Sequence, residues 1–125
     1  MQRSLKELPL YDRIQVALLR DALGEDDLRA MLSELPSAAR QAFHKIGSAL
    51  ASNDLEQVRR MAHAFACVAG SFGAARLAAI AREFELEAIS IPAMTHRMPA
   101  LAWAIDETVA ALPDIGRDPS EGAKV

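Results

Sequence analysis

Hydrophobic residues recur every three or four positions along most of the chain, a spacing that predicts amphipathic helices. Ile14, Leu18 and Leu19 follow this spacing in a first segment, at about 10–23, which Gly24 ends. The same spacing predicts longer helices at about 25–50, 55–69, 74–89 and 99–112. Short connections favour antiparallel neighbours, so we expect an all-α fold, an antiparallel four-helix bundle with a short extra N-terminal helix.

Prolines and glycines refine the expected limits of these helices. Pro36 removes one helical hydrogen bond, so a kink or a break is expected within the segment at about 25–50. Pro92 places the stretch at about 90–98 in a loop, whereas Pro99 suits the first turn of the last helix. Gly70 is expected just past the end of the helix at about 55–69.

The sequence length and the composition of the last residues define the expected domain. Residues 1–113 are expected to form a single domain, because 125 residues suit one hydrophobic core. Residues 114–125 are short, polar and rich in Gly and Pro, and are expected to form a flexible C-terminal tail.

Composition agrees with a helical fold and excludes several classes of protein. The chain is 51% hydrophobic but only 5% aromatic, and 25 alanines make up the difference, which favours helices over a β-sandwich. A net charge of −3 argues against a nucleic-acid partner, since binding of phosphate backbones requires positive charge. No stretch approaches the roughly 20 apolar residues of a membrane span, so no membrane partner is expected.

The single cysteine and the N-terminal residues bear on the compartment. Cys67 has no second cysteine with which to form an internal disulfide, which fits a reducing compartment. The first residues, 1–12, lack an apolar run of signal-peptide length. We therefore expect a cytoplasmic protein.

The helix at about 55–69 contains the most informative residue, His63. Its apolar positions form one stripe when residues are placed at steps of about 100°. The stripe consists of Leu55, Val58, Ala62, Phe65, Ala69 and Phe72. His63 lies about 120° from the centre of that stripe, so its imidazole is expected to face outward. A neutral imidazole is available as a nucleophile near neutral pH.

Small and basic side chains surround this histidine on the helical wheel. Cys67 and Gly70 follow it and leave room for a macromolecule, while Ala66 lies between this patch and the core. Arg59 and Arg60 precede it and could hold an anion or pair with acidic groups of a partner. The other two histidines, His44 and His96, lack such company and are expected to be structural or solvent-exposed.

The sequence MAHAFACVAGSFGAARL, at 61–77, resembles the signature of the histidine phosphotransfer (HPt) domain. In that resemblance His63 matches the phosphorylated histidine, and the Phe84-Glu85 pair matches a hydrophobic-Glu pair of the family. Further matches are Phe65, Gly70, Gly73, Ala74 and Leu77. The resemblance covers about 10–112 and implies an HPt-like bundle.

The resemblance also implies a function. The chain would relay a phosphoryl group between His63 and aspartates of response-regulator receiver domains, supplied by a receiver or a hybrid histidine kinase. Autonomous kinase activity is not expected, because the sequence contains no Gly-rich phosphate loop. No cofactor of its own is implied, and Mg²⁺ is expected on the partner receiver. The chain is expected to be a monomer.

The partner-binding surface implied by the resemblance surrounds His63. Its expected members are Arg59, Arg60, Ala66, Cys67, Gly70, Ala74 and Arg76. Ala66 and Cys67 stand where the family usually has Lys and Gly, and this motivates an alternative, a non-catalytic module that docks on a receiver or kinase without carrying phosphate. An unrelated four-helix protein, such as a dimerising adaptor or a structural subunit, is the third hypothesis.

Overall fold

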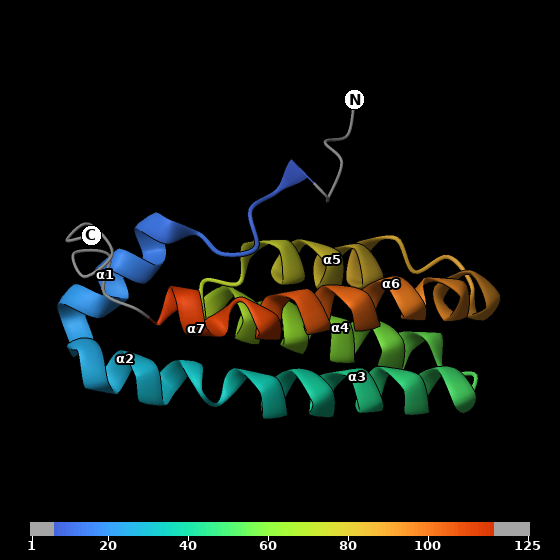
Figure 1. Ribbon diagram of the computed structural model, residues 1–125. Helices are drawn as coiled ribbons and strands as arrows, with labels where there is room; N and C mark the ends of the chain where they lie inside the picture. Colours follow the sequence, from blue (N-terminus) through green and yellow to red (C-terminus); the bar gives the residue numbers. More distant parts are fainter. Residues whose placement is uncertain (1–6, 117–125) are drawn as a thin grey trace.

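The computed structural model describes residues 7–116, and over this range the chain consists of helices joined by turns, with no strand. The helices in chain order are α1 (Arg13–Leu23), α2 (Glu25–Leu32), α3 (Leu35–Ala51), α4 (Leu55–Ser71), α5 (Ala75–Leu86), α6 (Ile91–Ala110) and α7 (Leu112–Ile115). In Figure 1, α3 to α6 run alternately in opposite directions along a common axis. The predicted all-α antiparallel four-helix bundle is therefore confirmed, with α1 as the extra N-terminal helix.

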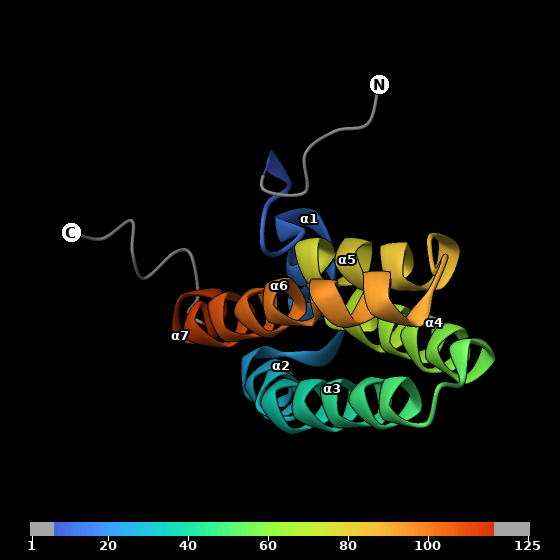
Figure 2. The ribbon, with the colours of Figure 1, turned by 90° about the vertical axis from the view of Figure 1, so that its right-hand side faces the viewer.

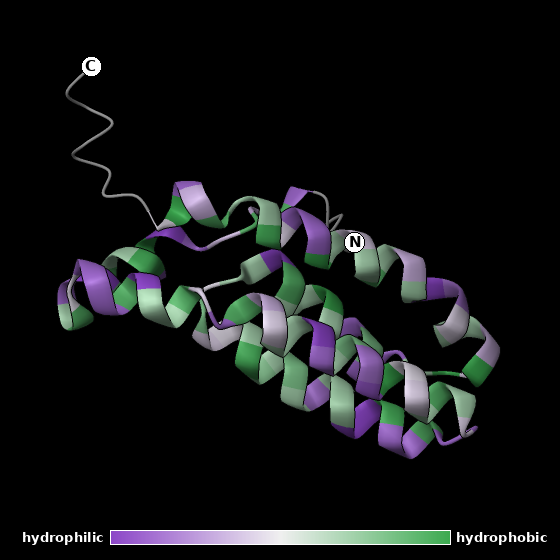
Figure 3. Cartoon of the chain, turned by 60° about the horizontal axis from the view of Figure 1, so that its bottom comes forward, coloured by the Kyte–Doolittle hydropathy of each residue, from purple (hydrophilic) through white to green (hydrophobic). Residues whose placement is uncertain are grey.

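Helices that are consecutive in the chain pack against each other in the bundle. The contact between α4 and α5 is the most extensive, α3 packs on both α4 and α6, and α6 closes the bundle against α5, as the end view in Figure 2 shows. Hydrophobic and hydrophilic residues are interspersed along the helices in Figure 3. The buried residues are apolar except for Thr108, so the helices turn their apolar faces inward. The largest fully buried side chains are Phe65, Phe84, Leu28, Leu35, Ile46, Leu77, Met94, Leu101, Val58 and Thr108.

The break expected at Pro36 is present. α2 ends at Leu32 and α3 begins at Leu35, so Pro36 occupies the first turn of α3, where its missing N–H costs no helical hydrogen bond. The two helices together occupy the segment at about 25–50, within which a kink or a break is expected from the sequence.

The first helix buries a different face from the one that its spacing predicts. Val16 is buried, whereas Ile14 and Leu18 are 77% and 64% exposed. Asp12 caps α1, and its backbone N–H donates to the carbonyl of Gly73 at 2.8 Å, which fixes the start of α1 against the turn between α4 and α5. Gly73 has a φ of +74°, and a Cβ there would lie 3.1 Å from Val16, so both the turn and the packing require glycine.

The stretch at about 90–98 is helical, and the predicted loop is wrong. Ser90 caps α6, since its hydroxyl accepts a hydrogen bond from the backbone N–H of Ala93 at 3.2 Å, and Pro92 lies in the first turn. Pro99 is inside the helix instead of at its start. Its ring lies on the exposed side of α6, where water can satisfy the freed carbonyl, and the buried Met94 holds the earlier turn against the bundle.

The folded part of the chain extends beyond the predicted boundary at 113. α7 includes residues 112–115, and Ile115 is buried. Arg20 donates to the carbonyl of Ile115 at 3.0 Å, and Arg29 donates to the carbonyl of Gly116 at 3.1 Å. These contacts tie residues 114–116 to α1 and α2. The remainder of the expected tail, 117–125, lies outside the described residues.

A buried tyrosine fastens the segment before α1 to α6. The Tyr11 hydroxyl donates to the backbone carbonyl of Thr108 at 2.8 Å. Tyr11→Phe is expected to lower the free energy of unfolding by about 1 kcal/mol, because it removes one buried hydrogen bond. Urea unfolding at neutral pH measures this difference, and equal stability of the two proteins would contradict it.

The same tyrosine gives a pH signature. Burial raises the pKa of Tyr11 above its ordinary value. Above about pH 10 the phenol ionises in the unfolded chain but stays protonated in the folded chain. The free energy of unfolding therefore falls as the pH rises above about 10, and it is expected to fall less in Tyr11→Phe. Tyr11 is the sole tyrosine of the sequence, so the absorbance of tyrosinate reports its titration directly.

Candidate functional site

His63 lies near the middle of α4 on its exposed side. Asp54 caps this helix by accepting a hydrogen bond from the backbone N–H of Gln57 at 3.0 Å. Val58, Ala62 and Phe65 turn into the core, and the His63 side chain is 63% exposed. The sequence-based prediction of its outward orientation is therefore confirmed.

A glutamate from α5 orients the imidazole. The Nδ1 atom of His63 lies 2.6 Å from Oε2 of Glu85, a residue 22 positions later in the chain. A carboxylate can only accept, so Nδ1 carries the proton and donates it to Glu85. In the neutral ring Nε2 then has the free lone pair. Glu85 is 25% exposed, which keeps the contact partly shielded from water.

Cys67 lies beside this second ring nitrogen. Its Sγ atom is 3.9 Å from Nε2 of His63, one helical turn further along α4. The thiol is free and exposed. Nε2 therefore points outward and toward the C-terminal half of α4, with a small side chain at its edge.

The arginines expected around His63 do not all gather there. Arg59 pairs with Glu56 at 3.3 Å and donates to the carbonyl of Ala88 at 2.9 Å, so it ties α4 to the end of α5. Arg60 is exposed on α4, one turn before His63.

Arg76 lies away from His63, contrary to the prediction. It donates to the carbonyl of Leu8 at 2.8 Å and pairs with Glu107 of α6 at 3.7 Å. These contacts hold the segment before α1 against the bundle, and the Arg76 side chain is mostly buried. It therefore anchors the fold and does not line the surface around the imidazole.

Two alanines expected at the partner surface are buried. Ala66 is 3% exposed on α4, and Ala74 is fully buried at the N-cap of α5. Neither offers a side chain that a partner could reach, because their helices pack so closely there. Gly70 is half-buried inside α4 and does not end it, and Gly73 takes the positive φ of the turn instead.

The start of α1 lies against the end of α4, the helix that carries His63. Gln15 donates to the carbonyl of Gly70 at 2.6 Å, two turns beyond His63 on α4. This contact places the start of α1 against the end of α4. Ile14 and Leu18, on the side of α1 opposite the buried Val16, are exposed apolar side chains in the same helix as Gln15.

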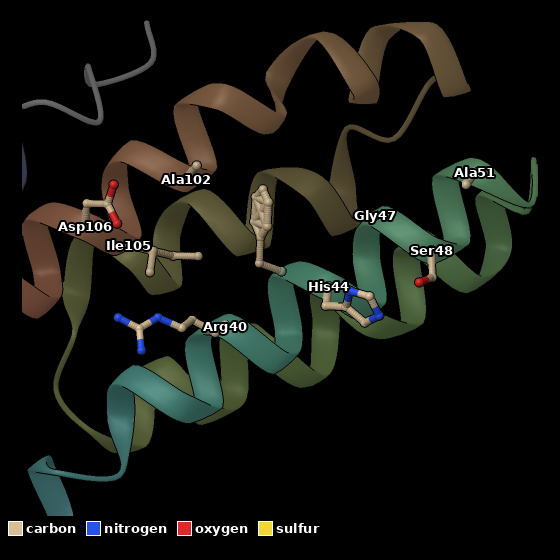
Figure 4. A pocket seen from close by; sticks show the side chains of 9 residues that line it. Arg40, His44, Gly47, Ser48, Ala51, Ala102, Ile105 and Asp106 are labelled. Atoms are coloured by element: carbon tan, nitrogen blue, oxygen red, sulfur yellow. The ribbon is translucent and has the colours of Figure 1, made fainter.

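A groove and the two other histidines lie on elements other than α4 and α5. An open groove between α3 and α6 is lined by Phe43, His44 and Ile105, with Arg40 and Asp106 near one end (Figure 4). His44 and His96 are both exposed, and His96 belongs to α6 instead of a loop.

Neither metal sites nor membrane spans occur in this part of the chain. No group of three or more His, Cys, Asp or Glu residues within 7–116 could hold a metal ion. No helix in this range is long and apolar enough to cross a membrane.

The sequence predicts His63 as a site residue but does not place Glu85 beside it. The available signal was the Phe84-Glu85 pair of the family resemblance, since periodicity alone does not tell which glutamate of α5 reaches α4.

Comparison with known proteins identifies the family. The family model of the Hpt domain matches residues 13–114, which is most of the chain. No curated protein and no solved structure matched. The match excludes the hypothesis of an unrelated four-helix protein. The bundle, the exposed His63 and this match agree: the chain belongs to the Hpt domain family, the phosphotransfer domains of two-component signalling.

Proposed function

We propose that the chain carries a phosphoryl group on Nε2 of His63 and exchanges it with the aspartate of a response-regulator receiver domain. The observation that supports this most strongly is the contact between His63 and Glu85, at 2.6 Å. It fixes the proton on Nδ1 and leaves a lone pair on the exposed nitrogen, which is the requirement for a phosphoacceptor.

The transfer is an in-line displacement at phosphorus. The Nε2 lone pair attacks the phosphorus of an aspartyl phosphate on the receiver, and the P–O bond to the aspartate breaks as the N–P bond forms. The electrons of the broken bond leave on the aspartate carboxylate. The ring becomes cationic, its proton stays on Nδ1, and the Glu85 carboxylate stabilises that charge. The reverse sequence returns the phosphoryl group to a receiver.

The partner supplies the remaining chemistry. The receiver, alone or as part of a hybrid histidine kinase, would hold Mg²⁺ to neutralise the phosphoryl oxygens. This chain would provide an accessible, positioned nucleophile, and such positioning supplies much of the reduction of the activation barrier in phosphoryl transfer. It needs no cofactor of its own in this scheme.

The docking surface runs from His63 across Cys67 and Gly70 to Ile14 and Leu18 of α1. It combines a reactive nitrogen, small residues that permit close approach, and exposed apolar side chains. Such a combination is typical of protein interfaces, whose centres are apolar and desolvated on binding.

A non-catalytic docking module is the second candidate. The thiol of Cys67 lies 3.9 Å from Nε2, at a position where the family usually has glycine, and it narrows the approach to the attacking nitrogen. In that case the chain would bind a receiver or kinase with unchanged affinity after His63→Ala, and no receiver would transfer phosphate to the wild-type chain.

Transfer from a labelled receiver tests the proposal directly. Phosphorylated receivers from the source organism are mixed one at a time with the purified chain, and label on the chain is quantified. We expect at least one receiver to produce an acid-labile, base-stable phosphate. Binding of a receiver without any such label would favour the docking module instead.

Glu85→Ala is expected to slow transfer to His63 by about 10-fold, because the ring loses the charge-assisted hydrogen bond that orients it and stabilises its cation. Single-turnover transfer from the phosphorylated receiver gives the rate. Glu83→Ala is the matched control, since Glu83 is also on α5 but pairs with Arg97 at 3.7 Å. Equal slowing in both variants would point to a general disturbance of α5.

A further inference from the structure

The direction of Nε2 defines where a bound phosphoryl group would lie. Nδ1 of His63 is held by Glu85 on α5, and Nε2 lies 3.9 Å from Sγ of Cys67. A phosphoryl group on Nε2 would therefore extend outward, beside the turn of α4 that follows His63. Any residue that binds its oxygens must reach this point.

The register between α4 and α5 places one arginine at that level. The contacts of His63 with Glu85 and of Arg59 with the carbonyl of Ala88 fix the two helices as antiparallel neighbours. One turn before Glu85 on α5, Arg82 then lies opposite Ala66, at the level toward which Nε2 points. Arg82 and Glu85 are three residues apart, so their side chains are neighbours on the surface of α5.

Arg82 is exposed and has no competing partner. It forms no ion pair or hydrogen bond with the residues that the structure describes, unlike Arg59 and Arg76, which are engaged elsewhere. Ala66 carries no side-chain atom beyond Cβ, so no long side chain of α4 stands between Nε2 and Arg82 at this level. The guanidinium is therefore available to an anion at Nε2.

The charges at the site favour such a contact. The phosphoryl group brings roughly two negative charges to Nε2 of a ring whose Nδ1 contacts the Glu85 carboxylate, and the two anions repel each other across the ring. A guanidinium beside Glu85 offsets this repulsion and presents paired N–H donors that match phosphate oxygens. Resting on the proposed function, we infer that Arg82 is the residue of this chain that binds the phosphoryl group carried by His63.

Phosphorus NMR on the chemically phosphorylated chain tests this assignment. Wild type, Arg82→Ala and Arg82→Lys are treated with potassium phosphoramidate, a small donor that needs no protein partner. We expect the titration midpoint of the phosphohistidine to rise by about 0.5 to 1 pH unit in Arg82→Ala, because a nearby cation favours the dianion. Arg82→Lys is expected to shift less, since it keeps the charge.

Arg60→Ala provides the matched control. Arg60 is also an exposed arginine on α4, but it lies one turn before His63. Nε2 points the other way along the helix, toward Cys67. The titration midpoint of Arg60→Ala is expected to stay at the wild-type value. Phosphohistidine in the wild type with the same midpoint in Arg82→Ala overturns the Arg82 assignment alone. No phosphohistidine in the wild type overturns both this assignment and the proposed function.

Discussion

His63→Gln is expected to abolish labelling of the chain by a phosphorylated receiver. Glutamine keeps a polar side chain of similar length but has no nitrogen with a free lone pair, because its amide nitrogen is conjugated with the carbonyl. The His63 side chain is 63% exposed and contributes no core packing, so the substitution leaves the bundle intact. Loss of acid-labile label, with an unchanged circular dichroism spectrum, is the expected result.

Two other histidines serve as matched controls for this variant. His44 on α3 and His96 on α6 are exposed, and neither lies on the α4–α5 face. His44→Gln and His96→Gln are expected to retain wild-type labelling. Label that persists in His63→Gln and disappears in His44→Gln or His96→Gln would show that His63 is not the phosphoacceptor.

Helical periodicity predicted the features that depend on one helix alone. The apolar stripe of α4 points to the core, so the outward orientation of His63 followed from its place on the wheel. The break before Pro36 followed in the same way, since a proline in the first turn is a local property.

Features that depend on two helices escaped the sequence analysis. The pairing of His63 with Glu85 requires the register of α5 against α4, which no spacing within either helix reveals. The burial of Ala66 and Ala74 has the same origin, because close packing of α4 on α5 covers residues that a single wheel leaves at the edge. Arg76 was misplaced because its partners, Leu8 and Glu107, are far from it in sequence.

Proline misled the prediction of α6 for a different reason. Pro92 predicts a loop at about 90–98, and Pro99, seven residues later, predicts the first turn of the last helix. A proline ends a helix only where its missing hydrogen bond and its ring cannot be accommodated. Here Ser90 caps the helix ahead of Pro92, and Pro99 faces outward, so the helix continues through both.

The face that α1 buries also differs from the prediction. The apolar residues that it leaves exposed are expected to have a large effect on receiver binding. Ile14 and Leu18 remain exposed next to the end of α4, although their spacing alone suggested burial. The double variant Ile14→Glu/Leu18→Glu is expected to weaken binding of the cognate receiver by about 100-fold, because each side chain contributes roughly 1.5 kcal/mol of apolar burial at the interface. Isothermal titration calorimetry with the unphosphorylated receiver measures the dissociation constant.

A control variant introduces a negative charge at an exposed apolar residue outside the proposed docking surface. It distinguishes a loss of docking from a general effect of negative surface charge. Trp103 is 65% exposed on α6, on the side of that helix opposite the buried Leu101 and Ile105. Trp103→Glu is expected to leave the receiver affinity within about twofold of wild type, because it touches no part of the docking surface. Phosphorylation of His63 by phosphoramidate is expected to be unaffected in both proteins, since that donor needs no docking. Equal weakening in both variants would remove α1 from the interface and restrict docking to the surface of α4 and α5.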